Sequence, residues 1–337
     1  MPSADKIELV LSDKVKVYGS GGGNKLKQFI VIYNLAKKLL REEKYDIITA
    51  QDQYYLALIG LCLAKKFKIG LEIQVHGFEK YYGVRKLIAK YVLRRANVVR
   101  GVSQRLKKQL INEFNVIADK ITVVPIFVNT NLSLRDRTGG RSNLTNSSRI
   151  CGARNDINAF IFLTVGRLVP VKNICLQIEV MAEVIKKYPN TELWIIGDGP
   201  ESEKLKLEIG NWKLEINVKL FGAQKDVSPY YVQANAFILT SNSEGWGMAV
   251  IEAASFGLPI IMTDVGCAGE VIINNESGLV IPVGGEHKLA EAMLKIIEDV
   301  NLRKKLGANA ELAVSRLPGK ERTLELYKKS WALALKK

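Results

Sequence analysis

Cysteine and histidine are scarce in this sequence, and the few that occur do not cluster. The four cysteines, Cys62, Cys151, Cys175 and Cys267, stand far apart without a Cys-x-x-Cys pair, and the chain has only two histidines. A zinc site needs several such ligands at short spacing, so the sequence indicates none. We expect reduced core thiols, as in cytosolic proteins, and neither a metal nor a cofactor.

Long apolar runs are also missing. The longest, from Tyr54 to Ala64, falls short of the roughly 20 residues that a membrane-spanning helix needs. It is better interpreted as a buried helix. The first ten residues contain no basic segment followed by an apolar stretch, so we expect no secretory signal. These features predict a cytoplasmic protein, which can still lie peripherally at the inner face of the cell membrane.

Positive charge is abundant and unevenly distributed. The formal net charge is +15, and residues 1–130 carry 23 Lys and Arg against 11 Asp and Glu, a net +12. Such a surface attracts anionic lipid headgroups, nucleic acid and phosphorylated acceptors alike. The basic helices contain few aromatic residues on which bases could stack, so we expect no nucleic acid as a partner. Segments 25–44 and 85–108 are the predicted contacts with an anionic membrane surface.

Short apolar runs alternate with amphipathic stretches throughout the chain, which is typical of β-α units that form parallel sheets. Helical periodicity is clear at 26–40 and 85–95 in the first half. The six apolar runs of the second half predict a doubly wound sheet. The predicted strands are residues 46–50, 71–75, 97–103 and 121–125, followed by 160–166, 192–197, 218–222, 235–241, 258–264 and 278–282.

The length and a change in composition predict two domains. Residues 135–158 lose all periodicity and are rich in Gly, Ser, Asn and Arg, which is typical of a linker, although a long surface loop would look the same. We therefore expect an N-terminal domain at 1–134 and a C-terminal domain at 159–318. The terminal helix at 319–337 can cross back to the first domain.

Two cations follow the first strand of the second half. Gly166 permits a tight turn, and Arg167 and Lys172 can then reach the crevice at the carboxyl ends of the strands. Two cations at that place suit a diphosphate. The alternative is a solvated turn with two ordinary surface charges.

Two glutamates frame a glycine-containing turn further along the chain. Glu244 precedes Gly245 and Gly247, and Glu252 follows in the next predicted helix. Free backbone N–H groups at a helix start bind anions, and carboxylates accept hydrogen bonds from paired hydroxyls. The site therefore suits a sugar phosphate. Glu252 could alternatively be an ordinary exposed helix residue, but the Ala-Ala-Ser that follows it predicts burial, and a buried glutamate needs a partner.

The segments GRLVPVKN, LWIIGDGPESEKL, VKLFGAQKD and SNSEGWGMAVIEAASFGLPIIMTDVGCAGEVI, in this order, resemble the group 1 retaining glycosyltransferases. The resemblance is strong at 160–285 and weaker upstream. It implies the GT-B architecture, an α/β fold of two Rossmann-like doubly wound domains. In that family the first domain begins with a β-α-β unit and its glycine-rich loop. Roughly 40 residues of that unit have no counterpart here, so acceptor binding is left open.

The resemblance also implies roles for particular residues. Arg167 and Lys172 would bind the donor diphosphate and stabilise it as it leaves, with Gly166 in the same loop, and no metal would be needed. Glu244 would lie near the transferred sugar, and Glu252 would bind the ribose. The backbone amides of the turn would contact the sugar, and a histidine would face it from the first domain. These remaining residues are Gly245, Trp246, Gly247, Met248 and His76. His76 alone would more simply be a structural histidine.

The sequence thus predicts a retaining, metal-independent hexosyltransferase. Its partners would be a nucleotide-diphosphate sugar and a sugar or lipid-linked acceptor, such as a glycolipid or polysaccharide precursor. Two alternatives stay open at this point. One is a phosphorylase or nucleotide-sugar hydrolase on the same scaffold, and the other is a basic protein that only binds membrane surfaces or nucleic acid.

Overall fold

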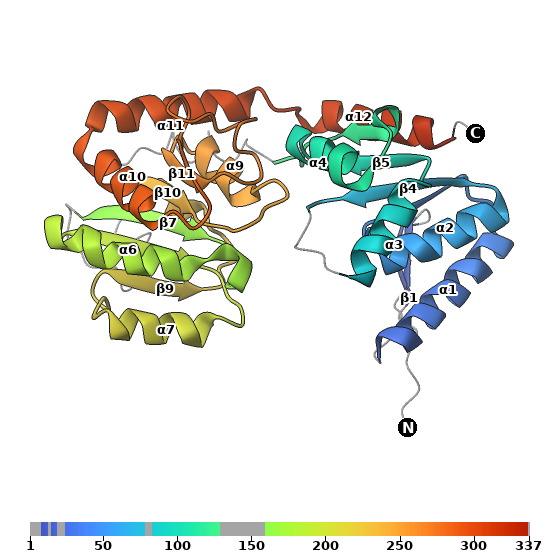
Figure 1. The fold of residues 1–337 in the computed structure, drawn as a ribbon, viewed down its shortest axis with the longest axis horizontal. Helices are drawn as coiled ribbons and strands as arrows, with labels where there is room; N and C mark the ends of the chain where they lie inside the picture. Colours follow the sequence, from blue (N-terminus) through green and yellow to red (C-terminus); the bar gives the residue numbers. More distant parts are fainter. Residues whose placement is uncertain (1–7, 13–14, 19–23, 78–82, 129–158, 336–337) are drawn as a thin grey trace.

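The computed structural model describes residues 8–12, 15–18, 24–77, 83–128 and 159–335. Two parallel-sheet α/β domains lie side by side in Figure 1. The predicted linker at 135–158 falls outside the described residues. The domain boundaries at 134 and 158 therefore stay a prediction.

The N-terminal domain is built on a four-stranded parallel sheet in the order β3-β4-β5-β6. All four strands coincide with predicted runs. A separate antiparallel pair, β1 with β2, precedes the sheet. The elements are β1 Glu8–Ser12, β2 Val15–Tyr18, α1 Lys25–Glu42, β3 Ile47–Ala50, α2 Tyr55–Phe67, β4 Gly70–Val75, α3 Val84–Leu93, β5 Val98–Gly101, α4 Gln104–Phe114, η1 Ala118–Lys120 and β6 Ile121–Val123.

The C-terminal domain contains a six-stranded parallel sheet in the order β12-β11-β10-β7-β8-β9. The elements are β7 Phe160–Val165, η3 Pro170–Lys172, α6 Ile174–Lys187, β8 Thr191–Ile196, α7 Ser202–Asn211, β9 Val218–Gly222, α8 Ser228–Gln233, β10 Ala236–Leu239, α9 Met248–Ser255, β11 Ile260–Thr263, β12 Leu279–Ile281, α10 Glu286–Glu298 and α11 Val300–Ser315. The chain order reverses between β7 and β10. That reversal is the switch point at which doubly wound sheets bind ligands.

Both faces of the C-terminal sheet are apolar because neighbouring strand residues point to opposite sides. Phe162 and Leu193 pack with one core cluster, whereas the adjacent Leu163 and Trp194 pack with the other. Helices α6 and α10 cover the first face and α9 and α11 the second. The sheet is thus rigidly enclosed, which fixes the loops at its carboxyl edge.

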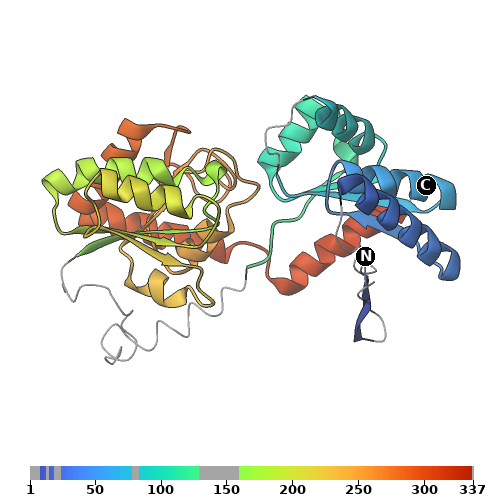
Figure 2. The same ribbon diagram turned by 90° about the horizontal axis from the view of Figure 1, so that it is seen from below.

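The last helix, α12 (Lys320–Leu335), lies on the N-terminal sheet rather than on the domain that precedes it, as both views show (Figures 1 and 2). The strand face beneath it is polar. Glu72 of β4 is fully buried, receives a 2.5 Å hydrogen bond from the Ser330 hydroxyl and lies 3.4 Å from the Arg100 guanidinium. Arg100 in turn stacks on the Tyr327 ring at 4.0 Å. Buried charges therefore join α12 to β4 and β5.

Candidate functional site

The loop after β7 presents the two predicted cations. The Gly166 amide donates to the Ile196 carbonyl of β8, and the chain then forms the 3-10 turn η3 before α6 begins. A Cβ on Gly166 would lie 3.7 Å from the Lys172 Cε, so the lysine side chain runs across this glycine. Lys172 is largely buried and Arg167 is exposed.

Hydrogen bonds tie this loop to the loop after β10. The Asn242 amide donates to the Val171 carbonyl at 2.7 Å. The Thr240 hydroxyl donates to the carbonyls of Lys172 at 3.2 Å and Asn173 at 3.0 Å. Gln177 of α6 donates to that same hydroxyl at 2.8 Å. The two loops of the switch point therefore act as one unit.

Lys172 and Glu244 meet at this switch point. The Lys172 ammonium lies 2.5 Å from the Glu244 carboxylate, whose side chain is 12% exposed. The Ser241 hydroxyl donates to the same carboxylate oxygen at 2.7 Å. The Arg167 guanidinium, by contrast, makes no hydrogen bond or ion pair with the described residues. The site thus offers one guanidinium and one ammonium to an anion, next to a carboxylate that can accept from hydroxyls.

The turn after Glu244 leads directly into α9. Gly247 has φ +87°, a left-handed conformation that favours glycine, and Met248 is the first residue of the helix. Trp246 is 3% exposed, and its carbonyl accepts from the Cys267 amide at 2.9 Å. Its side chain belongs to the core. We therefore expect Trp246 to contribute to a binding site through its main chain.

Glu252 lies further along α9 and is only partly exposed. Its carboxylate accepts a 3.0 Å hydrogen bond from the Tyr231 hydroxyl of α8. Burial raises the pKa of Glu252, and the hydrogen bond from Tyr231 acts in the opposite direction. The sequence required a partner for this glutamate, and Tyr231 supplies it.

His76 approaches from the other domain, at the carboxyl end of β4. A Cβ on Gly245 would lie 1.4 Å from the His76 carbonyl oxygen, so the two backbones touch where the domains meet. Partial burial and, secondarily, the charge of Arg100 lower the pKa of His76. The imidazole is therefore neutral near pH 7 and can both donate and accept hydrogen bonds.

The structure brings most of the predicted residues to one place. Lys172, Glu244 and Gly245 lie together, with His76 against them and Gly166 beneath the lysine. Arg167 follows Gly166 in the same loop, and Gly247, Met248 and Glu252 share α9 and its start. Their roles in binding and catalysis stay predictions.

Three supporting residues escaped the sequence analysis. Ser241 and Thr240 stand at the end of β10, a position that could have identified them as site residues. Tyr231 lies in a short helix after Tyr230 and carries no motif, so only the fold reveals its contact with Glu252.

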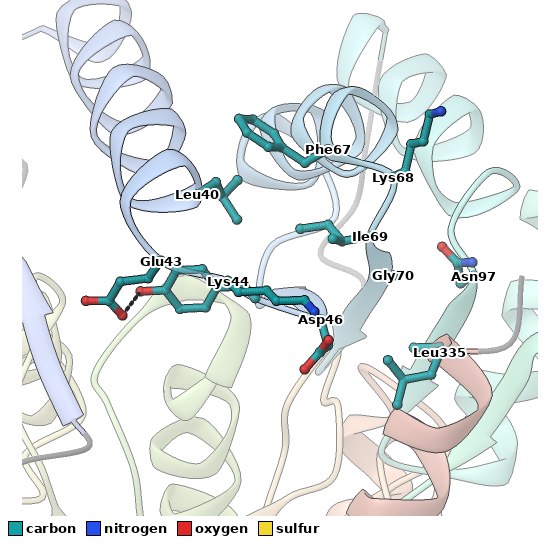
Figure 3. Close-up of a pocket in the computed structure, with 12 residues that line it drawn as sticks. Leu40, Glu43, Lys44, Asp46, Phe67, Lys68, Ile69, Gly70, Asn97 and Leu335 are labelled. Carbon is teal, nitrogen blue, oxygen red and sulfur yellow. Dashed lines mark hydrogen bonds between the residues drawn. The ribbon is translucent and has the colours of Figure 1, made fainter.

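A cavity of about 660 Å³ lies away from this site. It opens at the amino ends of β3 and β4, between the end of α1 and the end of α12, as Figure 3 shows with Leu40, Asp46, Gly70 and Leu335. His76 follows the opposite end of β4. In doubly wound sheets ligands bind at the carboxyl edge, so this cavity is not the candidate site.

Two negative findings concern the described part of the chain. No group of three or more His, Cys, Asp or Glu side chains is arranged there to hold a metal ion. Among the same residues, no helix has the length and apolar character needed to cross a bilayer.

Comparison with known proteins covers both domains. Residues 153–313 match the family model described as glycosyl transferases group 1, and residues 7–132 match the model described as glycosyltransferase family 4. An uncharacterised glycosyltransferase of Methanocaldococcus jannaschii is 29% identical, over 88% of this chain and 81% of its own. The alpha-monoglucosyldiacylglycerol synthase of Acholeplasma laidlawii is 25% identical, over 86% of this chain and 75% of its own.

A solved structure shares the fold. The structure of Anabaena HepE in complex with UDP and glucose aligns with a TM-score of 0.75 at 20% identity, covering 92% of this chain and 83% of that one. The likeness supports the two-domain architecture that the sequence predicted.

Proposed function

Because this chain belongs to the group 1 glycosyltransferases, we propose that it transfers a hexose from a nucleotide-diphosphate sugar to an acceptor hydroxyl, with retention and without a metal. The HepE structure, which holds UDP and glucose on the same fold, supports a donor of this class. The observation that carries the proposal is the Lys172–Glu244 pair at the switch point of the C-terminal sheet.

The proposed mechanism follows from how charge develops during the reaction. When the nucleoside diphosphate leaves, negative charge builds on its phosphate oxygens. Arg167 and Lys172 would neutralise that charge in place of a metal, helped by the positive end of α9. The Lys172 ammonium would then leave its ion pair with Glu244 and bind a phosphate oxygen instead. The freed Glu244 carboxylate would accept hydrogen bonds from the sugar hydroxyls.

Retention needs no carboxylate nucleophile in this proposal. The acceptor hydroxyl would attack the sugar carbon from the side on which the diphosphate leaves. Its proton would pass to a phosphate oxygen of the departing group. The backbone amides of Gly245 to Met248 and the neutral His76 would orient the sugar, and Glu252 would accept from the ribose hydroxyls.

Removing either member of the pair tests this function. Lys172→Ala and Glu244→Ala are expected to lower turnover of the sugar nucleotide about 100- to 1,000-fold, because each loses a preorganised charged group. The matched controls are Lys186→Ala and Glu183→Ala, since both residues are exposed on α6. Turnover equal to wild type in the two site variants would reject the assignment.

The same assay separates the related activities. Retention predicts that the product keeps the anomeric configuration of the donor, which proton NMR of the product reports. A chelator is expected to leave the rate unchanged. Dependence on inorganic phosphate would indicate a phosphorylase, and release of free sugar without acceptor would indicate a hydrolase.

We also propose that the acceptor is a glycolipid or polysaccharide precursor reached from a membrane surface. The name of the Acholeplasma relative, a synthase of alpha-monoglucosyldiacylglycerol, supports this class. Helix α3 provides a suitable surface. Val84, Leu87 and Tyr91 share one helical face and are 68%, 68% and 45% exposed. Arg85, Lys86 and Lys90 stand between them, and Arg94 and Arg95 follow.

Exposed apolar side chains flanked by cations are typical of helices that lie in a lipid interface. The residues from Gly83 to Asn112 include no Asp or Glu, so no charge within this stretch opposes anionic lipid. Binding is expected to be stronger on anionic than on neutral vesicles and to weaken as salt rises.

A further inference from the structure

The two domains are joined by a carboxylate that binds the start of a helix in the other domain. Glu270, in the loop after β11, accepts hydrogen bonds from the amides of Gln104 at 2.9 Å and Arg105 at 2.6 Å. These amides open α4, where the helix leaves its first N–H groups without helical partners. A carboxylate there is favoured by the helix dipole as well as by the two bonds.

Arg105 adds a second set of bonds across the same junction. Its guanidinium donates to the carbonyls of Asp264 at 2.8 Å and Ala268 at 3.1 Å, and also to the Asp264 carboxylate. The side chains of Arg105 and Asp264 are 40% and 59% exposed. Exposed ion pairs contribute little and are screened by salt, so Glu270 should provide most of the attachment.

This junction lies next to the candidate site. A cavity of about 160 Å³ separates the two and is bounded by Ser103 and Gln109 on the N-terminal side and by Ser243 and Glu244 on the other. Ser103 follows β5, and β5 pairs with β4, whose end carries His76. Holding the start of α4 therefore also holds His76 against Gly245.

We infer that Glu270 and Arg105 are positioning residues, which hold the domains in the arrangement that sets His76 against the Glu244 turn. In the part of the chain that the structure describes, neither side chain hydrogen-bonds to the proposed donor groups Arg167, Lys172 or Glu252. The effect on turnover rests on the proposed function, whereas the attachment itself does not.

A defined kinetic pattern follows. Arg167, Lys172 and Glu252 all belong to the C-terminal domain, so donor binding to that domain should survive loss of the attachment. The fraction of molecules in which both domains face the sugar should fall, and turnover should fall with it. Glu270→Ala is therefore expected to lower kcat about tenfold while donor Kd changes less than about twofold, because charged hydrogen bonds are lost.

The primary experiment needs no substrate. Hydrogen–deuterium exchange of the peptide that contains Gln104 and Arg105 is expected to accelerate in Glu270→Ala and, less strongly, in Arg105→Ala. Glu270→Gln keeps one oxygen acceptor and should recover part of the protection and of kcat. Glu276→Ala is the matched control for Glu270→Ala, since Glu276 is exposed in the same domain. Lys108→Ala is the matched control for Arg105→Ala, since Lys108 is exposed on the same helix.

The outcomes separate this inference from the proposed function. Unchanged exchange at Gln104 and Arg105 in Glu270→Ala would overturn the attachment. Faster exchange with unchanged kcat would overturn the positioning role. Absence of sugar transfer in the wild type, with exchange still dependent on Glu270, would reject the proposed function and leave the attachment in place. Melting curves of each variant verify that it is folded.

Discussion

At the scale of single residues, Glu252 is held in a state that disfavours its charge. Burial raises its pKa above the ordinary value of 4.5, and the single hydrogen bond from Tyr231 offsets this only in part. A carboxyl whose pKa is higher in the folded state contributes stability below its unfolded pKa. That contribution is lost as the pH rises through the folded pKa. At neutral pH the ionised Glu252 therefore costs stability.

Glu252→Gln is accordingly expected to melt at a higher temperature than wild type at pH 7, because the amide keeps an acceptor for Tyr231 without a buried charge. The difference should shrink as the pH is lowered and Glu252 becomes protonated. Thermal melts across pH 4 to 8 measure it. A lower melting temperature at pH 7, or a difference that does not change with pH, would contradict the argument. Donor affinity should fall in the same variant, as is common when a site residue is stabilised.

The sequence identified the charged residues of the site but not what holds them. Lys172 and Glu244 lie in the loops that follow two apolar runs, and strand ends are where doubly wound sheets bind ligands. Tyr231 and Gln177 lie on helices, in runs that show only helical periodicity. A contact between residues that are distant in the sequence leaves no local pattern, so these partners could not be predicted.

At the scale of elements, the turn between β10 and α9 has no room for a side chain at Gly245. A Cβ on Gly245 would lie 1.4 Å from the His76 carbonyl oxygen, in the other domain, so Gly245→Ala must separate the two backbones. We expect turnover to fall at least about tenfold, since misplacement near 1 Å is costly in catalysis. Melting of the C-terminal domain should change little, because the domains can move apart.

Two further glycines serve as controls for this turn. Gly197→Ala would place a Cβ 1.9 Å from the Gly166 carbonyl within one domain, at φ +138°, and should destabilise the fold itself. Gly319→Ala meets nothing within 4 Å and should be neutral. A Gly245→Ala variant with wild-type turnover would show that the contact has no part in catalysis.

The ten strands that the sequence predicted all occur, as β3 to β12, and their ends lie within one or two residues of the predicted ends. Strand order was not readable in detail. The pair β1–β2 was missed altogether. Its strands are short, and the sequence pattern of an isolated two-stranded hairpin is too weak to predict it.

At the scale of the whole molecule, part of the surplus of positive charge in the first half lies on α3, where it forms a basic surface. Replacing Val84 and Leu87 by serine is expected to weaken binding to anionic vesicles about tenfold or more, since two exposed apolar side chains lose their burial in lipid. Vesicle sedimentation at several salt concentrations measures this binding.

The matched control is Leu207→Ser on α7, because Leu207 is also 68% exposed but lies in the C-terminal domain. Its vesicle binding should equal that of wild type. Equal retention of the wild type on neutral and anionic vesicles, regardless of salt, would remove the membrane surface from the proposed function.

The charge asymmetry was visible in composition, but the junction between the domains was not. Glu270 and Arg105 stand 165 positions apart in the chain. Gly245 and His76 are similarly remote in sequence. Taken alone, none of these four residues differs from an ordinary surface residue of its type. Each obtains its partner only when the two folded domains pack against each other.

The position of α12 has a consequence for how the protein is made. Ribosomes release the chain from its amino end, so β3 to β6 emerge long before residues 320–335 can cover Glu72 and Arg100. Until then, two charges destined for burial face water on an unfinished sheet. The half of the molecule that is synthesised first should therefore be the last to become resistant to proteases.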